Sequence, residues 1–77
     1  MLFRSPEPRL IDGRDMLPPE PLERAVAELG RLGPDQELVL LLHCEPLPLY
    51  AILDRRGYRY HAVRCADGSN QIHIKKM

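Results

Sequence analysis

Three stretches of the chain show different hydrophobic periods, and each predicts one kind of element. Leu, Ala and Val recur at helical spacing between residues 22 and 32, which predicts an amphipathic helix that follows the proline-rich residues 18–21 and stops at Gly33. Residues 37–43 contain five consecutive aliphatic side chains, the pattern of a strand buried on both faces. Residues 71–75 alternate polar and apolar side chains, which predicts a strand with one exposed face.

Shorter signals complete the order of elements. Residues 8–12 predict a short first strand, because their apolar centre runs into a turn-prone Asp-Gly pair. Residues 46–56 predict a second helix that stops at Gly57, and residues 58–65 predict a strand. Asp67-Gly68 is a hairpin signal, so we expect the last two strands to pair antiparallel.

The resulting βαβαββ order predicts an α+β two-layer sandwich. A strand–helix–strand unit implies parallel strands joined by a right-handed crossover. We therefore expect the first two strands to be parallel and both helices to lie on one face of a four-stranded mixed sheet. A chain of 77 residues is long enough for one domain, which we place at residues 8–77 after a flexible tail at residues 1–7.

The other face of this sheet has no predicted helix to cover it. Leu38, Leu40 and Leu42 share one side of their strand. Val39 and Leu41 point to the opposite side, because successive side chains of a strand alternate. An exposed apolar patch of this kind is typical of a binding surface. We expect homodimerisation or docking of a protein partner on it; the alternative is that loops or the N-terminal tail cover it.

Composition excludes several classes of protein. Hydrophobic residues make up 44% and charged residues 29% of the chain, which excludes disordered, collagen-like and disulfide-scaffold proteins. No apolar run approaches the ~18 residues of a membrane span, and the first residues lack the apolar segment of a signal peptide. We therefore expect a cytoplasmic protein with no membrane partner, in which Cys44 and Cys65 are reduced thiols.

The net charge is zero, but it is unevenly distributed. Residues 1–45 carry a net charge of −4 and residues 46–77 a net charge of +4. A neutral total argues against a nucleic-acid partner, because such proteins are usually basic. The basic half, with Tyr58 and Tyr60 among its arginines, leaves RNA binding as a third hypothesis. If the two tyrosines face the core, the charges are a solvated face or a dock for an acidic protein.

Residues 11–21 resemble the strand-to-helix turn of the TusA/SirA-like sulfur carrier proteins. The pattern there is Asp-x-Arg-Gly-Leu-x-Cys-Pro-x-Pro, and it is matched at Asp12, Arg14, Pro19 and Pro21. Met16 stands in for the Leu, Asp15 replaces the Gly, and Pro18 occupies the position of the persulfide-carrying cysteine. Later features match in order and spacing, so the resemblance covers about residues 10–76 and implies the same βαβαββ fold.

The proline at position 18 changes the chemistry that the resemblance implies. A thiol at a helix N-terminus is favoured as a reactive thiolate, whereas Pro18 has no thiol and forms a rigid start for the helix. The chain is therefore similar to an uncharacterised branch of the family that lacks the cysteine. We expect a non-catalytic binding or adaptor domain linked to sulfur or redox metabolism.

We expect one ligand site, at the carboxyl ends of the two parallel strands, where open α/β sheets usually bind ligands. The residues expected to line it are Asp12, Arg14, Pro18, Pro19, His43, Cys44 and Glu45. A helix N-terminus at this edge favours an anion, so a small anionic ligand is expected. Persulfide carriage on Cys44 is the alternative function, and a half-buried inert thiol is the competing interpretation of that cysteine.

Other site chemistry has little support in the sequence. The chain has no C-x-x-C or H-x-x-x-H spacing, no Gly-rich phosphate loop and no serine on a strand-to-helix elbow. We therefore expect no catalytic residue, no metal and no cofactor. His61 and His73 lie on neighbouring strands, and the register of the hairpin decides whether they share a face.

Overall fold

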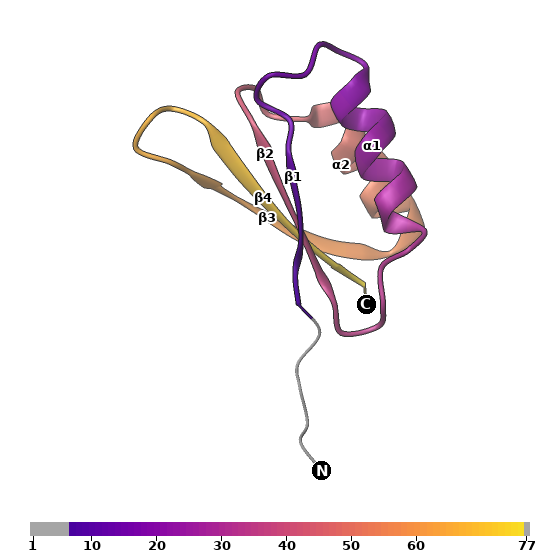
Figure 1. The fold of residues 1–77 in the computed structure, drawn as a ribbon. Helices are drawn as coiled ribbons and strands as arrows, with labels where there is room; N and C mark the ends of the chain where they lie inside the picture. The colour runs from indigo at the N-terminus through magenta and orange to yellow at the C-terminus, as the bar shows by residue number, and fades with distance from the viewer. Residues whose placement is uncertain (1–6, 77) are drawn as a thin grey trace.

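The computed structural model describes residues 7–76 and contains six elements in the order βαβαββ (Figure 1). They are β1 (Arg9–Asp12), α1 (Glu20–Leu29), β2 (Glu37–Leu42), α2 (Leu47–Arg56), β3 (Tyr58–Arg64) and β4 (Asn70–Lys76). Residues 1–6 of the predicted tail lie outside the described residues. The last tail residue, Glu7, accepts a hydrogen bond on its carbonyl from Nε2 of Gln36 at 2.9 Å.

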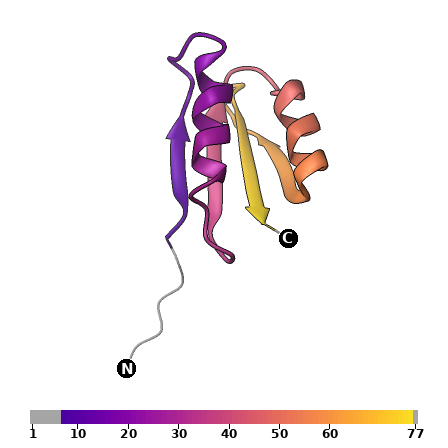
Figure 2. The same cartoon turned by 90° about the vertical axis from the view of Figure 1, so that its right-hand side faces the viewer.

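The four strands form one mixed sheet in the order β1-β2-β4-β3. β1 is parallel to β2, and β4 is antiparallel to both β2 and β3. Both helices lie on one face of this sheet (Figure 2). The predicted α+β two-layer sandwich is therefore confirmed. The hairpin signal predicts that β3 and β4 pair with each other, but it does not predict which of them lies next to β2. In the structure that strand is β4.

The core lies between the sheet and the two helices. Six aliphatic side chains with no exposed surface form its centre: Leu38, Leu40, Leu49, Leu53, Ile72 and Ile74. They come from β2, α2 and β4. Complete burial of a Leu or Ile side chain stabilises a fold by about 1.5–3 kcal/mol, so these residues hold the helical layer on the sheet.

The first helix is shorter than the hydrophobic spacing predicts. It ends at Leu29 and is followed by Gly30, rather than continuing to Gly33. The N–H of Leu32 donates to the Leu29 carbonyl at 3.2 Å, which is the three-residue spacing of a tighter turn. Leu32 is still only 3% exposed. The helical spacing of Leu32 therefore reflects its burial in the core, and the helix itself does not continue to this residue.

The boundaries of α2 and of the strands agree with the prediction or differ from it by one residue. Proline accounts for two of the shifts, since Pro8 has no N–H for the strand ladder and precedes β1, while Pro46 caps α2 rather than opening it. β2 and β3 each end one residue earlier than predicted, and β4 is one residue longer at each end. His43 consequently begins the loop that leads to α2.

Two tyrosines of β3 attach α2 and α1 to the sheet. The ring of Tyr60 stacks on Tyr50 with centroids 4.8 Å apart, and its hydroxyl donates to Asp54 at 2.9 Å. The Tyr58 hydroxyl donates to the Leu29 carbonyl at 3.3 Å. Both tyrosines therefore face the helices, as their alternation with charged residues predicts, and they do not present their rings to nucleic-acid bases on the opposite face.

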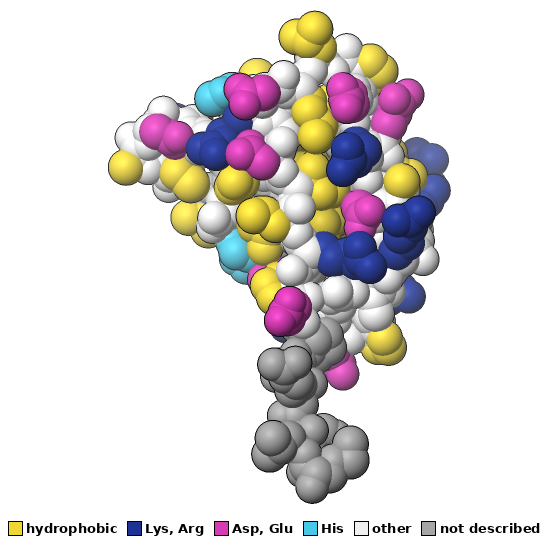
Figure 3. Space-filling model, in the orientation of Figure 1, with side chains coloured by type: hydrophobic (Ala, Val, Ile, Leu, Met, Phe, Trp, Pro, Cys, Tyr) yellow, Lys and Arg dark blue, Asp and Glu magenta, His cyan; other side chains and the backbone are white. Residues whose placement is uncertain are grey.

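The opposite face of the sheet, which we call the open face, carries the side chains that alternate with the core residues. Its central row is Leu10, Val39, His73 and His61, each paired in register with the next. The His61 and His73 rings stack with centroids 4.8 Å apart and 4° between their planes, so the two histidines share this face. Figure 3 shows hydrophobic side chains on the left flank, away from the helices, with a histidine among them.

Candidate functional site

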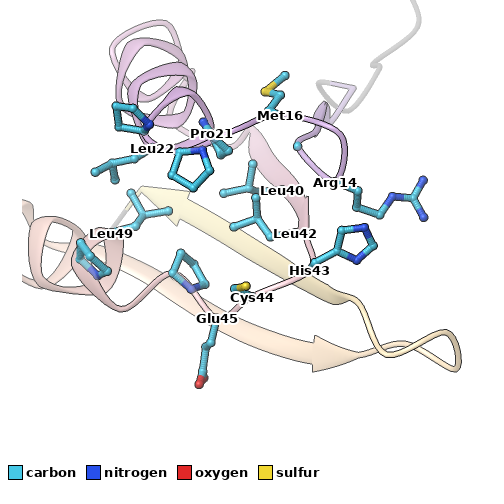
Figure 4. Close-up of a pocket in the computed structure, with 15 residues that line it drawn as sticks. Arg14, Met16, Pro21, Leu22, Leu40, Leu42, His43, Cys44, Glu45 and Leu49 are labelled. Atoms are coloured by element: carbon cyan, nitrogen blue, oxygen red, sulfur yellow. The ribbon is translucent and has the colours of Figure 1, made fainter.

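A cavity of about 420 Å³ opens between the start of α1 and the start of α2, at the carboxyl edge of β1 and β2 (Figure 4). We call it the proline cleft, after the five prolines in its wall: Pro18, Pro19, Pro21, Pro46 and Pro48. Its aliphatic lining is Met16, Leu22, Leu40, Leu42 and Leu49. The remaining wall residues are Gly13, Arg14, His43, Cys44 and Glu45. The interior of the cleft is therefore mainly apolar.

A close approach between β2 and the loop after β1 shapes this cleft. The N–H of Gly13 donates to the Leu41 carbonyl at 2.8 Å, and a Cβ at position 13 would lie 2.8 Å from Cδ2 of Leu42. A side chain here would displace the end of the Leu42 side chain and press on the Leu41 carbonyl oxygen, 3.2 Å from the Cβ position. From Gly13 the loop runs to the prolines that open α1, which brings them opposite the prolines that open α2.

Asp12 and Arg14 form an ion pair at the rim. The guanidinium donates from Nε and Nη2 to the two carboxylate oxygens of Asp12, at 2.9 and 2.8 Å. These hydrogen bonds lower the pKa of Asp12 from 3.8 to about 2. Nη1 of Arg14 also lies 3.6 Å from Asp67, in the turn between β3 and β4. Two carboxylates thus share the Arg14 charge, and its side chain points away from the cleft (Figure 4).

The first turn of α2 offers few free N–H donors to the cleft. The N–H of Leu47 donates to the Glu45 carbonyl and that of Leu49 to the Pro46 carbonyl, both at 3.0 Å. Pro48, between them, has no N–H at all. Because the donors that normally hold an anion at a helix start are engaged or absent, this end of α2 has lost most of its capacity to bind one.

The first turn of α1 is similarly short of donors. The N–H of Glu20 donates to the Leu17 carbonyl at 3.0 Å, and that of Glu23 to the Pro19 carbonyl at 3.1 Å. Pro21 has no N–H. The expectation of an anionic ligand depended on free N–H donors at a helix N-terminus, and the structure shows several of these donors engaged or replaced by proline.

The structure brings six of the seven predicted site residues together in the cleft wall: Arg14, Pro18, Pro19, His43, Cys44 and Glu45. Asp12 is the exception, since it is not part of the wall and binds Arg14 at the exposed end of β1. Cys44 is exposed rather than half-buried, and Cys65 has intermediate exposure. The competing interpretation of Cys44 as a half-buried thiol is therefore wrong, because His43–Glu45 form a surface loop after β2.

Residues 10–76 match a protein family described as Uncharacterized conserved protein (DUF2249). The chain belongs to this family. The DUF2249 fold is similar to the crystal structure of a SirA-like protein from Desulfitobacterium hafniense, with a TM-score of 0.74 at 22% identity over 84% of this chain and 92% of that chain. This similarity confirms the TusA/SirA-like fold that residues 11–21 indicate. A comparison with curated proteins gave no significant match.

The sequence patterns do not predict the apolar half of this DUF2249 site. They assign the leucines of the wall to the core and the prolines to rigid helix starts, roles that these residues also have in the structure. A signal was nevertheless present, since Pro-x-Pro occurs at the start of both helices, at residues 19–21 and 46–48. Two exposed leucines accompany these prolines: Leu17 is 79% exposed and Leu47 is 64% exposed.

Within residues 7–76, no group of three or more His, Cys, Asp and Glu side chains is placed to hold a metal ion. The stacked His73 ring is engaged on both nitrogens, with Oε2 of Glu37 3.3 Å from Nδ1 and Oε1 of Gln71 2.9 Å from Nε2. α1 and α2 have ten residues each, and no helix in the described part of the DUF2249 chain is long and apolar enough to cross a membrane.

Proposed function

We propose that this DUF2249 domain is a non-catalytic binding module whose proline cleft receives an apolar side chain of a partner protein. The observation that carries the proposal is the lining, in which five prolines and five aliphatic side chains surround the cavity. Burial of an apolar group there contributes about 25 cal/mol per Å². Proline rings have little freedom to lose, so binding immobilises few side chains.

The rim supports a protein partner over a small anion. Leu17 and Leu47 are exposed and adjoin wall residues in the sequence, and exposed apolar groups around an apolar cavity are typical of protein interaction sites. Arg14, the cation of the wall, is held by Asp12 and Asp67. The link to sulfur or redox metabolism rests on the resemblance to TusA/SirA-like proteins.

A binding role also suits the polar groups of the wall. The Glu45 carboxylate accepts a hydrogen bond from the Tyr50 hydroxyl at 3.5 Å, and the His43 carbonyl accepts one from Asn70 at 3.4 Å. A thiol nucleophile is activated by an adjacent base or by a lowered pKa. The two contacts attach the Cys44 loop to its own fold, and neither supplies Cys44 with a base. We therefore propose that the domain is not an enzyme.

A fluorescence titration with two related probes tests this proposal. N-phenyl-1-naphthylamine is neutral, and 8-anilino-1-naphthalenesulfonate adds a sulfonate to the same rings. If an apolar group is what the cleft accepts, the neutral probe binds at least as tightly as the anionic one. A clear preference for the sulfonate would contradict the proposal and restore the anionic ligand.

A matched pair of variants locates the probe. Leu22 points from α1 toward Leu49 across the cleft (Figure 4), so Leu22→Trp fills the cavity and should weaken the neutral probe by about tenfold or more, the equivalent of ~1.4 kcal/mol. Ala27→Trp places the same side chain on the exposed side of α1 and should leave binding unchanged. Equal affinities of the two variants would show that the probe binds elsewhere.

Persulfide carriage on Cys44 is the second candidate, because the thiol is exposed in the cleft wall. In this reaction the Cys44 thiolate attacks the outer sulfur of a donor R–S–SH. The donor S–S bond breaks, R–S⁻ leaves with the bonding electrons, and Cys44 becomes a persulfide with no net oxidation. Against it, the first-turn N–H groups of α2 donate to Glu45 and Pro46 carbonyls.

Intact mass after exposure to a low-molecular-weight persulfide separates the two candidates. A carrier gains one sulfur atom that is removed by a reductant, and Cys44→Ala abolishes the gain. Cys65→Ala is the matched control, since this second thiol, directly after β3, is not part of the cleft wall. A binding module shows no gain that depends specifically on Cys44.

A further inference from the structure

We propose that the open face of the sheet is a homodimer interface, on which a second copy of the chain packs through the same face. This interface is separate from the proline cleft, which lies between the helices and the strand ends. The proposal therefore does not depend on what the cleft binds.

The open face has an apolar centre. Leu10 of β1 is 65% exposed and Val63 of β3 is 44% exposed. Between them lie Val39 and Leu41 of β2, the first only 9% exposed and the second half-buried. The stacked His61 and His73 rings continue this row toward β3. The apolar side chains of the face lie on β1, β2 and β3, whereas β4 contributes the polar Gln71, His73 and Lys75. Exposed apolar side chains grouped on one face are suited to contact with a second protein surface.

The charged groups of this face are separated by sign across the sheet. The acidic groups are Glu37 on β2 and Asp12 on β1, the latter paired with Arg14. The basic groups are Lys75 on β4 and Arg59 on β3. Glu37, Lys75 and Arg59 form one row, in which each residue pairs in register with the next. The acidic first half and basic second half of the chain thus become an acidic and a basic side of one surface.

A surface of this kind is complementary to a copy of itself. A two-fold axis that runs along the strand direction, between β2 and β4, places β1 and β2 of one copy over β3 and β4 of the other. Glu37 of each copy then faces Lys75 of its mate, and the Leu10–Val39 end of the central row faces the His61–His73 end. Two twisted sheets pack in this aligned way, about 10 Å apart.

The size of the face predicts a weak dimer. Four strands at about 4.8 Å spacing and up to seven residues at ~3.4 Å cover roughly 20 by 20 Å. Such an area lies below the ~800 Å² per partner of a standard interface. We therefore expect an equilibrium between monomer and dimer that depends on concentration and ionic strength.

The test exchanges one charge in each of two variants of the full chain. In the Glu37→Lys homodimer two lysines face each other at each contact, and in the Lys75→Glu homodimer two glutamates do. For each variant alone, the dimer dissociation constant from sedimentation equilibrium should be about tenfold or more above that of the wild type, because like charges across an interface repel. An equimolar mixture re-forms both opposite-charge contacts and should regain dimerisation.

The mixing step distinguishes an interface from a folding effect. Glu37 and Lys75 are also neighbours within one chain, and neither variant regains that internal contact in the mixture, so recovery on mixing reports only the contact between copies. Glu23→Lys, on the exposed side of α1, is the control and should dimerise like the wild type.

Three outcomes would overturn the proposal. In the first, the wild-type chain is monomeric at millimolar concentration, and a soluble paramagnetic agent broadens the Leu10 and Val63 amide signals. The face would then be free to bind another protein. A second is a monomer in which those amides are protected, which assigns the face to residues 1–6 of the same chain. The third is a dimer that the charge exchanges do not weaken.

Discussion

The guanidinium of Arg14 binds both carboxylate oxygens of Asp12, two residues away, with N···O distances of 2.9 and 2.8 Å. The same side chain reaches Asp67 at 3.6 Å, so the pair connects the end of β1 with the turn between β3 and β4. In the sequence these two residues are expected to line a ligand site. In the structure they stabilise the rim and leave the cleft apolar.

Acid titration should reveal this pair. Hydrogen bonds from Arg14 lower the pKa of Asp12 from 3.8 to about 2 in the folded state. The folded pKa lies below the unfolded one, so the contribution is complete above about pH 4 and is lost as the pH falls from there to about 2. Urea midpoints at several pH values should therefore fall less steeply over this window for Asp12→Asn than for the wild type. Parallel curves would contradict the assignment.

A side chain at Gly13 should destabilise the fold. In Gly13→Ala the new Cβ meets Cδ2 of Leu42 at 2.8 Å and the Leu41 carbonyl oxygen at 3.2 Å, and overpacking of this kind costs about 1–3 kcal/mol. Gly30→Ala is the control, because its nearest contact is an ordinary 3.5 Å and it lies in right-handed helical conformation. Urea denaturation of both variants is the check, and equal stabilities would mean that the β1–α1 loop is not held against β2.

Burial should decide the cost of shortening a leucine on the sheet. Leu38 has no exposed surface, whereas Leu10 of β1, which pairs with Val39, is 65% exposed on the open face. Leu38→Ala should therefore cost about 2–5 kcal/mol in the free energy of unfolding, and Leu10→Ala less than about 0.5 kcal/mol. The measurement is made at a protein concentration low enough to keep the chain monomeric. If Leu10→Ala lowered the free energy of unfolding more than Leu38→Ala, the core would lie on the opposite face of the sheet.

Tyr60 should ionise late. Its hydroxyl donates to Asp54, and this hydrogen bond raises the pKa of Tyr60 above its usual 10.0. Because the folded pKa is raised, the contribution to stability is present below pH 10 and is lost at higher pH. An NMR titration of the tyrosine ring signals should show the Tyr60 pKa move back toward 10 in Asp54→Asn.

Much of the fold follows from local patterns in the sequence. The alternation of Ile72 and Ile74 with polar residues, and the five aliphatics of β2, correctly predict which side chains are buried under the helices. Leu32 shows the limit of that reasoning, because its helical spacing reflects contact with the core while its backbone is a turn. A hydrophobic period reports which side chains are buried and is only an indirect guide to backbone hydrogen bonds.

The candidate site was less predictable because its character depends on contacts between distant residues. The sequence correctly brings residues 14, 18–19 and 43–45 to one edge, since parallel strands end together. It does not show that Arg14 is bound by Asp67, more than fifty positions along the chain. Nor does it show that prolines from two helix starts meet across one cavity. These contacts turn an expected anion site into an apolar cleft.

Mapping of the neutral naphthalene probe by NMR is the most direct test of the central claim, that the proline cleft binds an apolar group. N-phenyl-1-naphthylamine is added to ¹⁵N-labelled protein, and amide shifts are followed across the chain. The account predicts that the largest shifts fall on wall residues such as Leu22, Cys44 and Leu49, and that Leu22→Trp removes them. Shifts concentrated on Leu10, Val63 and the histidines of the open face, with the cleft unchanged, would contradict it.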